Sequence, residues 1–214
     1  MTSLNPVGVA LFVAVALWLA RMWFREAKEN PQGGGGLPGA SSCPARAVAV
    51  AVAGTLVLLG LEIWGEIRLG IAEEQKDVSW LALPLFVAAA FTEEVIFRGY
   101  LVVERRGNAV RWASIVAFSL IFALMHDHLW SFEMPDDRSA GTFAAIREGF
   151  SLNFSVKGFF STGFIFAGAL WFYFVRFFRW NPHASLLAPV AAHLAKNVVV
   201  FFVKLAQGHV TSWI

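Results

Sequence analysis

The sequence predicts an all-α membrane protein, a polytopic bundle of about six transmembrane helices. Of its 214 residues, 57% are hydrophobic and only 15% are charged, whereas soluble domains are about 45–50% apolar and about 25% charged. The apolar residues are gathered into blocks that are long enough to cross a bilayer. The net charge of +2 is small and no basic patch with interleaved aromatic residues is present, so nucleic acid is not expected as a partner.

The first apolar block runs from Pro6 to Trp23 and is followed by basic residues up to Lys28. A secretory signal carries its positive charge before the apolar run. Met1 to Asn5 contains no basic side chain, so a retained first helix is expected rather than a cleaved peptide.

The segment from Glu26 to Pro44 contains four consecutive glycines and three prolines, which predicts a flexible linker outside the membrane. Its Cys43 is the only cysteine of the chain, which excludes an internal disulfide and a multi-cysteine zinc site. We therefore expect residues 1–44 to form a first helix and a linker, and residues 45–214 to form the core.

Four of the remaining blocks are predicted to be single spans: Ala45 to Trp64, Ala109 to Met125, Val156 to Phe178 and Ala184 to Ala206. Small residues in the third of these, Gly158, Gly163 and Gly168, would permit close helix contact. Between the spans, residues 62–77 are expected to form a water-exposed loop, and residues 127–155 a polar region with an amphipathic piece from Thr142 to Phe150.

The segment from Val78 to Arg106 is the remaining predicted span. A helix of about 29 residues would measure about 43 Å, which places Glu93 well inside the bilayer. No internal repeat is present in the chain.

Lysine and arginine residues in the connections predict the orientation of the bundle, since cytoplasmic loops are enriched in them. With the N-terminus outside, nine basic residues lie inside: Arg21, Arg25, Lys28, Arg46, Arg105, Arg106, Arg111, Arg176 and Arg179. Five lie outside: Arg68, Lys76, Arg138, Arg147 and Lys157. This excess favours both termini outside, in a bacterial cytoplasmic membrane.

Two adjacent carboxylates and an arginine interrupt the apolar pattern at Glu93, Glu94 and Arg98. Ionisable groups at membrane depth are costly and usually functional. On a helix, Glu94 and Arg98 are four residues apart and can pair, while Glu93 is turned about 100° away. We therefore expect Glu93 to be the carboxylate that is free for chemistry.

Three further polar side chains belong to predicted spans, namely His126, His193 and Asn197. Together with Glu93 they have the composition that hydrolysis of an amide by water requires. A carboxylate removed from bulk water can act as general base, and an imidazole can orient the water or carry its proton. The pair His193 and Asn197, four residues apart, can donate to a developing oxyanion. No Gly-x-Ser-x-Gly sequence offers a serine nucleophile instead.

Other interpretations of these residues remain open at this point. Glu93, His126 and His193 also form the two-histidine, one-carboxylate set of a catalytic zinc site, although the His-Glu-x-x-His pattern is absent. The same groups could serve only to hold helices together, as in a non-enzymatic immunity or assembly protein. A small transporter is disfavoured because paired broken helices and an inverted repeat are not evident.

Three motifs in this order resemble those of the CPBP family of intramembrane glutamic proteases, which is CAAX protease-like and also contains bacteriocin-processing proteins. They are Glu93-Glu94-x-x-x-Arg98, Phe122-x-x-x-His126 and His193-x-x-x-Asn197. The resemblance covers residues 81–202 and identifies residues 45–214 as a protease core.

The resemblance implies a membrane endopeptidase that needs neither metal nor other cofactor and acts on a membrane-anchored or lipid-modified protein or peptide. It implies that Glu93 activates water with the help of His126, and that His193 and Asn197 form the oxyanion hole. It further implies that Glu94 and Arg98 give structural support and that Phe122 lines the substrate pocket. Some family members, the myxosortases, remove C-terminal helix tags from surface proteins. Lys196 departs from the family pattern.

Overall fold

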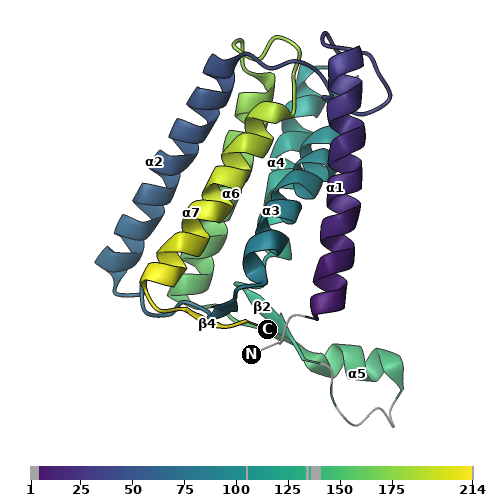
Figure 1. Cartoon of the computed structure of the whole chain (residues 1–214). Coiled ribbons are helices and arrows are strands. Elements are labelled where there is room, and N and C mark those ends of the chain that lie inside the picture. The colour runs from purple at the N-terminus through teal and green to yellow at the C-terminus, as the bar shows by residue number, and fades with distance from the viewer. Residues whose placement is uncertain (1–4, 105, 134, 136–140, 214) are drawn as a thin grey trace.

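The computed structural model describes residues 5–104, 106–133, 135 and 141–213, and these form a bundle of long helices (Figure 1). Arg105 and Arg138, which were counted in the prediction of orientation, lie outside the described residues. Five helices are long and apolar enough to cross a membrane: α1 (Pro6–Glu29), α2 (Ala45–Leu69), α4 (Asn108–Met125), α6 (Val156–Phe177) and α7 (Leu187–Ala206). The predicted all-α class is confirmed, and each of these five helices begins or ends close to a predicted bound.

The second helix is longer than predicted. We expected residues 62–77 to form a water-exposed loop because of their charge, but α2 continues to Leu69. Glu62 and Glu66 consequently face the interior of the bundle, where each is paired with a lysine. The high charge of this segment predicted exposure to water, because composition carries no information about partners on distant helices.

The predicted span from Val78 to Arg106 is not one continuous helix. It begins with strand β1 (Val78–Ser79), continues as helix α3 (Ala82–Glu93) and changes into a π-helix, η1 (Glu94–Tyr100). The helical part is therefore about ten residues shorter than the predicted span. Together, α3 and η1 form a sixth helical rod in the bundle.

The rod formed by α3 and η1 lies between α1 and α7, while α2 packs on α6 and α7, and α4 packs on α6. A buried cluster of Trp23, Phe91 and Leu186 joins α1 and α3 to the segment before α7. Burying apolar side chains of this size against one another stabilises the bundle by dispersion and close packing, which drive helix association in lipid.

The segment between α1 and α2 is packed against the bundle, although its glycines predicted a flexible linker. Trp23 Nε1 donates to the Pro38 carbonyl at 3.2 Å, and the Leu37 amide donates to Glu26 Oε1 at 2.7 Å. Gly39 has a φ of +61° and approaches the backbone of Leu186, a position that a larger side chain would obstruct. These contacts fix the segment to the end of the bundle.

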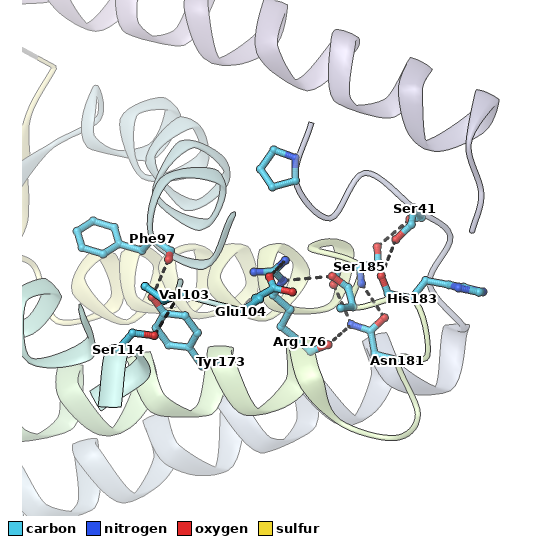
Figure 2. A network of polar contacts seen from close by, with 12 residues as sticks. Ser41, Phe97, Val103, Glu104, Ser114, Tyr173, Arg176, Asn181, His183 and Ser185 are labelled. Atoms are coloured by element: carbon cyan, nitrogen blue, oxygen red, sulfur yellow. Dashed lines mark hydrogen bonds and ion pairs between the residues drawn. The ribbon is translucent and has the colours of Figure 1, made fainter. Parts of the chain in front are cut away.

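A network of polar contacts closes the same end (Figure 2). Asn181 donates to the carbonyl groups of Arg176 and Ser185, and the Ser185 hydroxyl donates to the Ser41 carbonyl at 2.8 Å. The buried guanidinium of Arg176 pairs with Glu104 at 2.8 Å. Most polar groups of this network find partners within it, as a membrane-embedded bundle requires, although Nη1 of Arg176 has none within the described residues.

The opposite end carries the short strands and both termini of the described chain (Figure 1). Strand β1 pairs in parallel with β4 (Val210–Ser212), and β2 (Trp130–Phe132) pairs in antiparallel fashion with β3 (Phe150–Leu152). The predicted amphipathic piece is helix α5 (Thr142–Gly149), which follows β2 and precedes β3 in the chain.

Candidate active site

The change from α-helix to π-helix occurs between the two glutamates. Glu93 is the last residue of α3, and Glu94 is the first of η1. The wider turn of η1 is closed by the Leu101 amide, which donates to the Ile96 carbonyl at 3.0 Å. The hydroxyl of Tyr173 on α6 donates to the Phe97 carbonyl at 2.6 Å and so ties η1 to its neighbour. Such π-helical segments are frequent at functional sites.

The predicted ion pair between Glu94 and Arg98 is present and fully buried. Their side chains meet at 3.1 Å between Oε1 and Nη1, and both side chains are 0% exposed. The rings of Phe122, Phe172 and Tyr173 surround the guanidinium at 4.5 to 5.2 Å from their centroids. An aromatic cage of this kind stabilises a cation that is removed from water.

His193 lies between the two glutamates. Its Nδ1 is 2.9 Å from Glu94 Oε1, and its Nε2 is 3.7 Å from Glu93 Oε2. A carboxylate oxygen only accepts, so Nδ1 carries a proton toward Glu94. The Glu93 side chain is 32% exposed and has no hydrogen-bond partner within the described residues. Of the two carboxylates, Glu93 is therefore the one available to a ligand.

His126 and Asn197 are each held by a backbone carbonyl. Nδ1 of His126 is 2.8 Å from the Phe122 carbonyl, which leaves the lone pair of Nε2 free to accept a proton. The Asn197 amide donates to the Phe86 carbonyl at 3.0 Å. Because a carboxamide has two N–H donors, one of them remains.

One cavity of about 810 Å³ brings these groups together. Its lining includes all four predicted catalytic residues, Glu93, His126, His193 and Asn197, and it also includes Phe122. The remaining two predicted site residues, Glu94 and Arg98, lie behind His193 in the protein interior. The cavity extends to the end of the bundle that carries the strands, where Lys76, Asp127 and His128 line it.

Aromatic side chains position the two histidines. Phe122 packs on His126 with ring centroids 4.9 Å apart and meets His193 edge-on at 6.1 Å. Phe172 stacks on His193 at 5.0 Å. The sequence analysis did not single out Phe172 or Tyr173, because two more aromatic residues in an aromatic-rich helix carry no distinguishing pattern.

Of the three glycines expected to permit close helix contact, Gly158 makes the closest approach, but to the loop after α4 and not to a helix. A Cβ atom at Gly158 would lie 2.5 Å from the His128 carbonyl oxygen, so α6 approaches the segment after His126 closely.

Burial lowers the pKa of His128 to about 4, with a contribution from the nearby His126. His128 is therefore neutral at pH 7 and adds no charge to the mouth of the cavity.

The zinc alternative requires three protein ligands that meet at one point. Within the residues that the structure describes, no three histidine, cysteine, aspartate or glutamate side chains are close enough together to hold a metal ion.

Fold and site together define a multi-pass membrane protein with carboxylate and imidazole groups in an intramembrane cavity. More than half of the chain, residues 75–199, matches the family described as type II CAAX prenyl endopeptidase Rce1-like. The chain belongs to this family and is therefore a membrane protease. The matched range includes every residue of the three motifs. No curated protein and no solved structure matches the chain.

Proposed function

We propose that this protein is a glutamate-dependent intramembrane endopeptidase that hydrolyses a peptide bond in a membrane-anchored or lipid-modified protein. The observation that carries the proposal is that Glu93, His126, His193 and Asn197 line one cavity inside an apolar bundle. Three separate helical segments supply them, and a purely structural role does not explain why Glu93 has no hydrogen-bond partner among the described residues.

Glu93 and His126 would activate the attacking water. A water between them can donate to the Glu93 carboxylate, and Nε2 of His126 can accept a second hydrogen bond because Nδ1 is engaged by Phe122. As the water oxygen bonds to the carbonyl carbon, its proton passes to Glu93. Delivery of that proton to the leaving nitrogen then breaks the C–N bond and gives a carboxylic acid and an amine.

His193 and Asn197 would stabilise the oxyanion. Asn197 retains one N–H that is not used by Phe86. Nε2 of His193 donates when both of its nitrogens carry protons, and the Glu94 carboxylate beside Nδ1 balances the resulting charge. Donors that are already oriented in a site shielded from water are worth more than the same groups in water.

The substrate would reach the cavity from the lipid. Phe12 of α1 and Glu62 of α2 both line the cavity, but α1 packs on α3 whereas α2 packs on α6 and α7. A membrane-anchored chain could pass between two helices that have different partners without unfolding the bundle. This argument supports a membrane-anchored or lipid-modified substrate, such as the prenylated proteins to which the family description refers.

Glu93→Gln is the variant that tests the proposal. We expect it to lower the rate of hydrolysis by about 10²- to 10⁴-fold, the usual contribution of a general base. Protein termini in membranes from cells with the wild-type or the variant protein, compared by mass spectrometry, would identify the substrates as termini that vanish. Glu73→Gln is the matched control, because Glu73 is exposed and outside the cavity.

Both variants must accumulate to the wild-type level for the comparison to hold. If every terminus persists in membranes with the Glu93→Gln variant and the biological role also survives, the non-enzymatic packing role is favoured. Purified protein treated with a chelator addresses the zinc alternative, since a glutamate-dependent enzyme keeps its activity under this treatment and a zinc enzyme loses it.

A further inference from the structure

Helix α7 presents a stripe of side chains to the cavity, and a lysine lies within it beside the catalytic pair. The stripe consists of His193, Lys196, Asn197, Val200 and Lys204. Lys196 follows His193 by three residues, which places it on the same face and about 4.5 Å farther along the helix axis. Its ammonium group lies against Gly168 of α6, across the cavity.

The ammonium of Lys196 pairs with the carboxylate of Glu62 through a long contact. Its side chain is 19% exposed, and Nζ is 3.5 Å from Glu62 Oε2. Within the part of the chain that the structure describes, Glu62 is its one charged partner. Because an ammonium has three N–H donors, the group can take a further oxygen ligand from the cavity.

The other lysines of the cavity differ in this respect. Lys76 donates to Asp127 at 2.7 Å, and Lys157 donates to Glu66. Lys204 donates to the Lys76 carbonyl at 2.7 Å and to Gln75 at 3.2 Å. These contacts are shorter than that of Lys196 and hold the helices and the loop before β1. Lys196 therefore stands apart as the cavity lysine with the longest contact to its partner.

We propose that Lys196 binds a carboxylate of the substrate that lies one to three residues from the scissile bond. Carboxylates form the strongest hydrogen bonds with ammonium groups, and an extended chain advances about 3.3–3.6 Å per residue. The carboxylate could be the C-terminus of the peptide or an aspartate or glutamate side chain. The inference rests on the proposed function, because it takes the cavity to be a peptide site.

Binding to the Glu93→Gln protein tests this without requiring hydrolysis. Three fluorescent peptides share one sequence with a prenylated cysteine four residues from the end. One ends in a free acid, one in an amide, and one in an amide with a single aspartate after the cysteine. We expect one of the two charged peptides to bind about 10- to 100-fold more tightly than the uncharged amide in fluorescence anisotropy. Which of the two does so identifies the source of the carboxylate.

Lys196→Met in the same background should abolish that difference, whereas Lys204→Met should retain it. Glu62→Gln is a second variant, in case Lys196→Met does not fold. It removes the acid beside the ammonium and should increase the preference for the charged peptide. Equal affinity for all three peptides, no binding at all, or a preference that survives Lys196→Met would overturn the inference.

Hydrolysis of the same peptides by the wild-type protein is measured separately. Cleavage of all three peptides at equal rates would leave the endopeptidase function intact and remove the role of Lys196. Binding that depends on Lys196 without any cleavage would count against the proposed function and leave the carboxylate site standing.

Discussion

Glu93 and Glu94 are adjacent in the chain and have opposite surroundings. Glu94 is fully buried between Arg98 and His193, whereas the Glu93 carboxylate is partly exposed to the cavity. The spacing of four residues predicts the pair between Glu94 and Arg98, since such residues share a helix face. The contact of Glu94 with His193 could not be predicted, because 99 residues separate the two and no local rule relates them.

Arg98→Leu is expected to unfold the site rather than slow its chemistry. It leaves the Glu94 carboxylate buried without its cation, and breaking a buried pair in this way costs about 3–5 kcal/mol. Protease resistance and thermal stability of the detergent-purified variant are the measurements, with Glu93→Gln beside it. Wild-type stability of Arg98→Leu would contradict the structural role of the pair.

Among the helices and strands, the π-helix η1 is the element that the hydrophobicity pattern did not predict. The segment from Val78 to Arg106 reads as one apolar run, and hydrophobicity does not distinguish an α-turn from a π-turn. What holds the wider turn is the tertiary contact from Tyr173 to the Phe97 carbonyl. A residue on a different helix therefore decides the local geometry next to Glu94.

Tyr173→Phe removes that hydroxyl and leaves a buried carbonyl without its partner, which costs about 1–3 kcal/mol. We expect lower thermal stability and a loss of hydrolysis, because η1 carries Glu94 and Arg98. The chain has only one other tyrosine, Tyr100, which is 60% exposed. Tyr100→Phe is therefore the control, and an equal effect of the two substitutions would argue against the contact.

At the scale of the whole molecule, the two ends of the bundle differ in character. The end with the linker between α1 and α2 is closed by the network of Figure 2, while the cavity reaches the end that carries the strands and both termini. Six helical rods return the chain to the side on which it began. The described basic residues remain more numerous near the closed end, the side predicted to lie inside.

We expect the mouth of the cavity to open on the outer face of the membrane. Single cysteines at Glu73 and at Gly36, in a Cys43→Ser background, would report this with a thiol reagent that does not cross membranes, because both positions are exposed. Labelling in intact cells at Glu73 and only after lysis at Gly36 is the expected outcome. The reverse pattern would show that the orientation predicted from the lysine and arginine residues is wrong and that the mouth of the cavity faces the cytoplasm.

Hydrophobicity and length alone predicted the helix bundle and most helix bounds, and the polar residues within the spans predicted which side chains would be candidates for the site. Length and hydrophobicity dictate spans because a bilayer leaves backbone groups no other partner, and costly polar groups at membrane depth stand out for the same reason. Contacts between distant helices were needed to show that Glu62 and Glu66 face inward, that η1 is a π-helix, and that Lys196 faces Glu62 in the cavity. Each of these features depends on a residue far away in the chain, and such contacts produce no periodic pattern in the sequence.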